Sequence, residues 1–327
     1  MEPALSTVAD LLAAAGRAGH TVLPVEVVLR TCSADALRAA IAAGDVLEVE
    51  WSGEPAVSLV EVAETEEMLA DGLAGLAAEN RLVVVVGPAA TGRAQSLATA
   101  LDGVPAVVLD DAHRSGIDDV LAAVEDLPET SVLALSLDPA LPLAAVPGAV
   151  ALDLAASGIC PVLQATVPPA RTTLARARAD VAAGRWFDTN AEDRTIVEVR
   201  VTSPEEALAR VGQLVSTSIP RAFDIAASQV AVLLGPGSLE PDAVRAALQG
   251  ADVVLLTGPL ERGWEAVVVV LGPPGPATTR ALVYAGLMAG DRHVSVVHPG
   301  DPAAFTATMA GSPDRPRRTR LAALLAG

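Results

Sequence analysis

The chain has 327 residues, of which 51% are hydrophobic and only 2% aromatic, so its core must consist mostly of Ala, Val and Leu. This length indicates two domains, or one large domain with a small appendage. The formal net charge of −18 opposes autonomous binding to nucleic acid, which needs Lys and Arg to displace counterions, although a local basic groove remains compatible with it.

The cysteines and the apolar segments indicate in which compartment the protein is expected. Cys32 and Cys160 lie far apart without metal-type spacing, which argues against a disulfide framework or a zinc site. The N-terminus lacks the basic and apolar segments of a signal peptide, and no long apolar run predicts a membrane span. We therefore expect a cytoplasmic protein with no membrane partner. The arginines at 315–320 are expected to form the solvated end of a C-terminal helix.

The pattern of apolar residues in 1–62 predicts a small helical module that precedes the main fold. Apolar periodicity indicates helices at 4–18, 22–29 and 34–43, then strands at 46–51 and 56–59. Short helices followed by a β-hairpin suggest a winged-helix-like module. Such modules contact either DNA or other proteins, and the acidic composition of this one favours a protein contact.

Strands and helices alternate through the rest of the chain, which predicts an α/β fold with doubly wound parallel sheets. The first domain is expected at residues 63–190 and the second at 191–327, because the polar stretch at 188–194 resembles a boundary. In the first domain we predict strands at 81–87, 106–110, 131–136 and 161–165 and helices at 61–79, 93–101, 117–127, 149–156 and 173–183. In the second we predict strands at 196–201, 229–234, 252–256, 266–271 and 293–298 and helices at 204–216, 241–248, 278–288 and 302–310.

A degenerate phosphate loop follows the first predicted strand of the main fold. The segment Gly-Pro-Ala-Ala-Thr-Gly-Arg-Ala at 87–94 has the spacing of a P-loop, whose glycines let backbone N–H groups surround phosphates. Gly87, Thr91, Gly92, Arg93 and Ala94 are therefore the candidate cofactor-binding residues. Arg93 replaces the lysine with a bulkier planar cation, and Ala94 replaces the hydroxyl that binds magnesium. A turn without ligand, residual nucleotide binding and productive hydrolysis all stay open.

An acidic pair ends the next predicted strand. Asp110 and Asp111 stand where carboxylates can hold magnesium and polarise an attacking water, so they are the candidate catalytic residues, with Asp110 as the metal ligand. The alternative is a solvated strand end, with Asp111 beginning a turn.

The order of these segments resembles the RecD-type DNA helicases of superfamily one. Residues 87–94 correspond to the first motif of that family, 110–113 to its second, and Leu-Asp-Pro-Ala-Leu-Pro at 137–142 to its third. The resemblance implies two RecA-like P-loop NTPase domains after the N-terminal module. It also implies ATP and Mg²⁺ as cofactors, single-stranded DNA as a partner and ATP-dependent helicase activity.

The departures from that family fall on the motif residues that carry its catalytic chemistry. The third motif lacks its glutamine, Arg171 stands beside the expected arginine position at Ala170, and the Gln-Gly signature is missing from 257–263. Ala289 occupies the arginine-finger position and Asp291 reverses a second charge. Loss of such an arginine lowers phosphoryl transfer about a thousandfold or more.

We therefore expect a catalytically inactive, helicase-like protein that acts as a binding or regulatory partner, for example of an intact helicase, with ATP and Mg²⁺ bound weakly or not at all. Two alternatives remain: an ATP-dependent helicase or translocase with unusual motifs, and a nucleotide-binding switch that does not hydrolyse. Net charge opposes single-stranded DNA as a partner.

Overall fold

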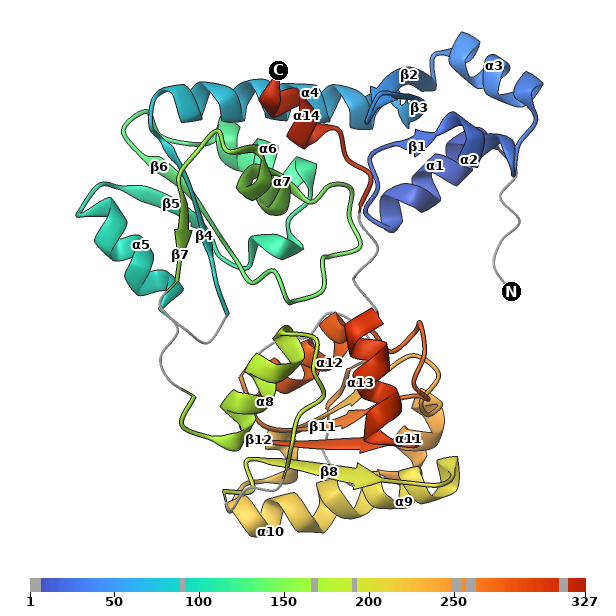
Figure 1. Cartoon of the computed structure of the whole chain (residues 1–327), viewed down its shortest axis with the longest axis vertical. Helices are drawn as coiled ribbons and strands as arrows, with labels where there is room; N and C mark the ends of the chain where they lie inside the picture. Colours follow the sequence, from blue (N-terminus) through green and yellow to red (C-terminus); the bar gives the residue numbers. More distant parts are fainter. Residues whose placement is uncertain are drawn as a thin grey trace. The chain divides into compact units, whose positions relative to one another are not determined.

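The chain folds as a mixed α/β protein with two parallel sheets (Figure 1). The computed structural model describes residues 7–88, 92–165, 170–189, 193–248, 254–256, 263–311 and 317–327. These form two compact units: residues 1–139, 143–167 and 316–327 make up the first, and residues 140–142 and 168–315 the second. The boundary expected between 190 and 191 thus lies inside the second unit, and the C-terminal residues return to the first.

The N-terminal part of the first unit packs three helices against a small antiparallel sheet. The helices are α1 (Val8–Arg17), α2 (Val25–Leu29) and α3 (Ala34–Ala43), and the strands lie in the order β1 (Leu23–Pro24), β3 (Glu54–Leu59), β2 (Val46–Trp51). The helix expected at 22–29 begins only at Val25. Pro24 favours an extended residue before it, and Leu23 pairs with Val57 of β3 instead.

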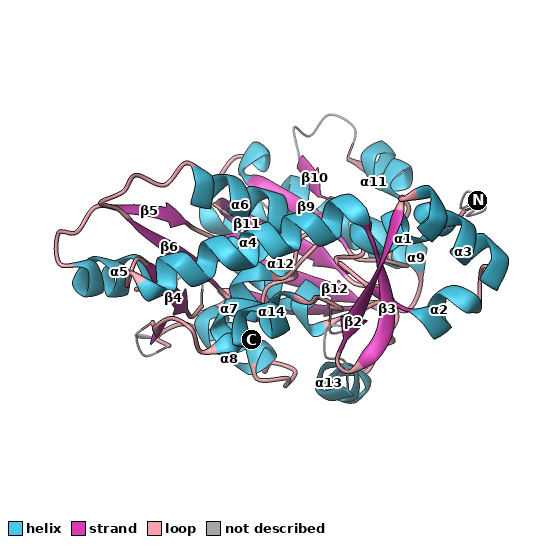
Figure 2. Cartoon of the chain, turned by 90° about the horizontal axis from the view of Figure 1, so that it is seen from above, coloured by secondary structure: helices cyan, strands magenta, loops and turns pink. Residues whose placement is uncertain are grey.

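The main sheet of the first unit has four parallel strands in the order β5-β6-β4-β7. They are β4 (Leu82–Val86), β5 (Ala106–Leu109), β6 (Val132–Leu137) and β7 (Val162–Gln164). The helices α4 (Val60–Ala78), α6 (Ile117–Glu125), α7 (Val150–Ser157) and α14 (Leu321–Ala326) share one buried core with this sheet (Figure 2). Leu97 of α5 (Arg93–Leu101) packs on Val83 and Val85, which point to the opposite face because side chains alternate along a strand.

The second unit holds a five-stranded parallel sheet in the order β10-β9-β11-β12-β8. Its strands are β8 (Ile196–Arg200), β9 (Val230–Leu234), β10 (Val254–Leu256), β11 (Trp264–Val270) and β12 (Gly290–His298). Its helices are α8 (Thr173–Ala182), α9 (Pro204–Gln213), α10 (Ile219–Phe223), α11 (Pro241–Ala247), α12 (Arg280–Ala289) and α13 (Pro302–Gly311). The central strands β9 and β11 contain continuous buried apolar runs, at 230–234 and 266–270, because helices cover both faces.

A buried carboxylate joins the C-terminal segment to the rest of the first unit. Glu66 of α4 is fully buried and accepts hydrogen bonds from the backbone N–H groups of Arg320 (2.9 Å) and Leu321 (3.1 Å) and from the hydroxyl of Thr21 (2.9 Å). The guanidinium of Arg320 donates to Glu66 at 3.2 Å and to Glu67 at 2.9 Å. Arg320 is therefore buried, and our expectation of a solvated arginine tail is wrong for this residue.

Arg317 anchors the same segment through backbone carbonyls. Its guanidinium donates to the carbonyls of Val146 (3.0 Å), Gly148 (2.6 Å) and Ala144. A Cβ atom at Gly19, whose φ is +89°, would lie 2.2 Å from this guanidinium, so Gly19 is needed both for its backbone conformation and for this close approach.

The substitution Glu66→Ala should destabilise the first unit by about 3–5 kcal/mol, because it leaves the buried Arg320 with only the half-exposed Glu67 as a counter-charge. Glu67→Ala removes the other carboxylate bound to Arg320, whose side chain is 52% exposed, and should cost less than about 1 kcal/mol. Hydrogen exchange in increasing urea, read separately for peptides of each unit, measures both losses. Equal losses for the two variants would contradict the central role of Glu66.

Asp153 of α7 introduces a pH dependence in the same region. Burial raises its pKa from 3.8 to about 7, the nearby Glu66 adds to this rise, and a hydrogen bond with Thr319 and the charge of Arg317 oppose it. The folded state therefore holds a proton that the unfolded chain releases near pH 4, so stability should fall as pH rises from about 4 to 7. In Asp153→Asn this part of the pH slope of the unfolding free energy should disappear. An unchanged slope in urea titrations would contradict the assignment.

Candidate functional site

The predicted phosphate loop and the acidic pair meet at one edge of the main sheet in the first unit. β4 ends at Val86 and β5 at Leu109, and β6 lies between them. Because parallel strands place their carboxyl ends at the same edge, Gly87 and Asp110 both follow strands that end on this side. The edge is where open α/β sheets carry their ligand sites.

An ion pair joins these two segments. Arg93 begins α5 and is only 3% exposed. Its Nη2 atom donates to Asp110 at 3.1 Å and to Asp111 at 2.8 Å. The side chain of Asp110 is 70% exposed and that of Asp111 is 25% exposed, so Asp111 is the more deeply placed partner. The cation expected to contact phosphate is thus bound to the carboxylates expected to hold magnesium.

Gly87 has a structural reason to be glycine. A Cβ atom at this position would lie 2.6 Å from the Cβ of Ala165, which follows β7. The N–H of Gly87 donates to the carbonyl of Leu137 at 3.0 Å, so this amide already has a partner within the protein. Close packing between β7 and the turn after β4 therefore accounts for the first glycine of the motif.

The remaining candidates of the loop contribute little to a metal site. Gly92 is the N-cap of α5, and Ala94 is exposed with a methyl group where a hydroxyl would be needed. Thr91 lies outside the described residues. The structure brings together Arg93, Asp110 and Asp111, and Gly87 lies in the neighbouring turn.

These residues do not fit a magnesium nucleotide. Magnesium is usually held by carboxylate and hydroxyl oxygens together with phosphate oxygens. Here Arg93 is bonded to both carboxylates, and Ala94 has no side-chain oxygen. Among the described residues, no group of three or more His, Cys, Asp or Glu side chains could hold a metal. The Nη1 of Arg93 is buried and has no hydrogen-bond partner in the described part of the chain; it is a donor, suited to an anion and not to a metal.

In the second unit, the position expected for an arginine finger is occupied by a packed alanine. Ala289 is buried at the end of α12, so no side chain can reach a ligand from there. Arg178 of α8 instead donates to the carbonyls of Leu287 (3.0 Å) and Gly290 (2.6 Å). Arg171 is exposed, and residues 257–262 of the predicted fifth motif lie outside the described residues.

Sequence reasoning missed the contact between Arg93 and the two aspartates. A signal was present, because arginine at a lysine position brings a planar fork of donors suited to carboxylates. Whether that fork contacts a ligand or the protein depends on how α5 packs against the end of β5, which a linear pattern does not contain.

Comparisons with known proteins add little about function. No family model and no curated protein matches the sequence. Among solved structures, the chain is similar to the helicase nonstructural protein 10 of Arterivirus, with a TM-score of 0.36, 11% identity, and coverage of 81% of this chain and 72% of that chain. A likeness at this level carries no argument about activity. None of the described helices is long and apolar enough to cross a membrane.

Replacing Arg93 should destabilise the first unit more than replacing its exposed partner Asp110. Arg93→Met keeps the apolar stem but leaves Asp111 without its cation, and should cost about 1.5–3 kcal/mol, the range for a hydrogen bond to a charged group. Asp110→Asn, at an exposed carboxylate, should cost less than about 1 kcal/mol. Urea unfolding of both variants measures the difference. Equal stability of Arg93→Met and the natural chain would show that the ion pair does not brace the sheet edge.

Proposed function

We propose that this chain is a helicase-like protein of the RecD type that has kept an α/β framework but does not transfer phosphoryl groups, and that it acts by binding another protein, for example an intact helicase. The observation that carries the proposal is the pairing of Arg93 with Asp110 and Asp111. Phosphoryl transfer needs the cation on phosphate and the carboxylates on magnesium, and here each neutralises the other.

The proposal also covers the domain organisation and the kind of partner. In this proposal the two parallel sheets belong to two RecA-like domains, and the N-terminal helices with their hairpin act as a winged-helix-like module for protein contacts; the parallel strand order supports the first part. A net charge of −18 disfavours single-stranded DNA as the main partner.

A second candidate is a nucleotide-binding switch that works without hydrolysis. The buried Nη1 of Arg93 supports it, because a phosphate oxygen could satisfy this donor without any metal. A phosphate would then bind equally well in the presence and absence of magnesium.

The decisive measurement is ATP turnover with and without single-stranded DNA. We expect turnover at the background level, with no further loss in Asp110→Ala, because that carboxylate already binds Arg93. DNA-stimulated turnover that disappears in Asp110→Ala would overturn the proposal and favour a working helicase.

Calorimetry with ATP distinguishes the second candidate. For an inert site we expect no heat of binding in either magnesium or EDTA. Heat that persists in EDTA and disappears in Arg93→Met would favour the metal-free switch. Glu64→Gln, at an exposed carboxylate of α4 away from the sheet edge, is the control for a general change in charge.

A further inference from the structure

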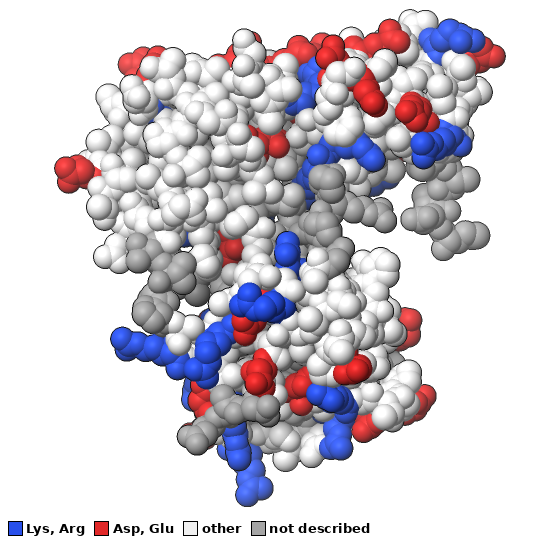
Figure 3. Space-filling view, in the orientation of Figure 1, with Lys and Arg blue, Asp and Glu red and all other residues white. Residues whose placement is uncertain are grey.

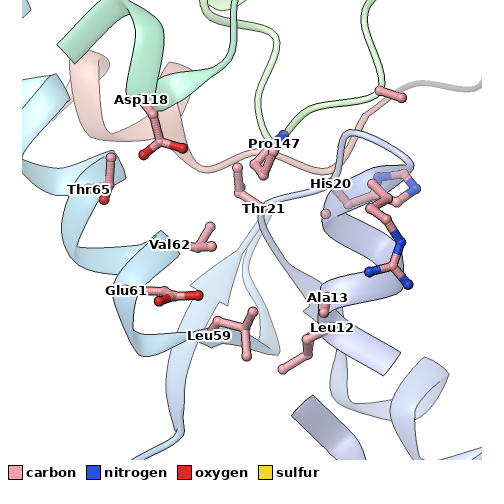
Figure 4. A pocket seen from close by; sticks show the side chains of 13 residues that line it. Leu12, Ala13, His20, Thr21, Leu59, Glu61, Val62, Thr65, Asp118 and Pro147 are labelled. Atoms are coloured by element: carbon pink, nitrogen blue, oxygen red, sulfur yellow. The ribbon is translucent and has the colours of Figure 1, made fainter. Parts of the chain in front are cut away.

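A cavity of about 540 Å³ lies within the first unit, between the N-terminal helices and the main sheet's helices (Figure 4). Its walls come from α1, the segment after α1, the end of β3, the first turns of α4 and α6, and the loop at 145–147. Its size falls in the range of sites that hold small ligands or inserted side chains.

The floor of the cavity is apolar, and one wall is acidic. Leu12, Leu59, Val62 and Pro147 supply the apolar surface. Glu61, Thr65 and Asp118 lie around it on the α4 and α6 side, as Figure 4 shows, with His20 on the α1 side. An apolar floor beneath carboxylates suits a side chain with an aliphatic stem and a cationic end.

The two carboxylates are not used within the described structure. The carboxylates of Glu61 and Asp118 form no hydrogen bond or ion pair with another described residue, whereas the carboxylate of the adjacent Asp119 accepts from the backbone N–H of Gly116 at 2.9 Å. Asp119 therefore caps α6, and Asp118 is left facing the cavity. Both unused carboxylates lie in the first turn of a helix.

The opposite wall supplies a donor. Arg17, in the last turn of α1, lines the cavity and forms no hydrogen bond or ion pair with a described residue. A ligand that matches both walls needs a cation for Glu61 and Asp118 and an acceptor for Arg17. A peptide carrying Arg or Lys meets both needs, because its backbone carbonyls accept hydrogen bonds, whereas a simple diamine has no acceptor.

The charge of the whole chain favours the same partner. Acidic residues outnumber basic ones by 40 to 22, and acidic side chains gather along the edge formed by α4 (Figure 3). Such a surface attracts basic partners and repels nucleic acid.

We propose that this cavity is a docking site for a basic segment of a partner protein, with an Arg or Lys side chain lying on the apolar floor and its cation between Glu61 and Asp118. This inference goes beyond the phosphate-loop argument and uses none of its residues, so ATP turnover and peptide binding can fail independently.

Panning a phage library of random short peptides against the full chain tests the proposal. We expect the enriched peptides to contain Arg or Lys next to apolar residues. As synthetic peptides, measured by fluorescence anisotropy, they should bind the double variant Glu61→Gln/Asp118→Asn about tenfold or more weakly than the natural chain. The control Glu64→Gln/Asp71→Asn removes two charges from exposed positions of α4 outside the cavity and should bind normally.

Cross-linking locates the contact. The 22 basic residues of the chain are all arginines, so a carbodiimide that joins a peptide lysine to a carboxylate finds no competing lysine in the protein, and the product should map to Glu61 or Asp118. Failure to enrich any peptide, enrichment of peptides without a basic residue, or equal binding by the two double variants would overturn the proposal. So would displacement by n-butylguanidinium at the concentration at which the peptide itself binds, because that result indicates a site for small cations.

Discussion

The pairing of Arg93 with Asp110 and Asp111 is the constraint on which the chemistry of the first unit depends. It connects the first turn of α5, which follows β4, to the end of β5, although β6 lies between β4 and β5 in the sheet. An ammonium group is a compact point charge, whereas a guanidinium is a planar fork that can serve two carboxylates together. In a chain whose basic residues are all arginine, the position predicted to contact phosphate forms an ion pair within the protein.

The first unit thus contains two sites with opposite properties. At the sheet edge, cation and carboxylates satisfy one another, and the residues around them are fixed by packing, as at Gly87 against Ala165. In the cavity beside α1, the side chains of Arg17, Glu61 and Asp118 form no hydrogen bond or ion pair with a described residue and lie around an apolar surface. At the sheet edge the charged groups already gain their interaction free energy from one another. In the cavity the same gain requires a ligand.

Local pattern was enough to predict most of the elements, and long-range contacts account for what it missed. The expected ends of α3, β2 and α5 agree with the structure, because apolar periodicity and capping residues such as Ser33 are local signals. Glu66 is one of several acids in the helix expected at 61–79, and it meets Arg320 across 254 positions. Nothing near either residue in the sequence marks that contact, which also explains why the arginine tail was misjudged.

The return of the C-terminal segment to the first unit sets an order for folding during synthesis. Domains usually fold as they leave the ribosome, N-terminal part first. Here α14 completes the core around α4 and α7, and it is translated only after the whole sheet of the second unit. Until then the Glu66 carboxylate lacks its arginine and the apolar faces of α4 and α7 lack their cover. The nascent chain therefore exposes an apolar surface until α14 has been synthesised. Exposed apolar surface of this kind is what chaperones bind.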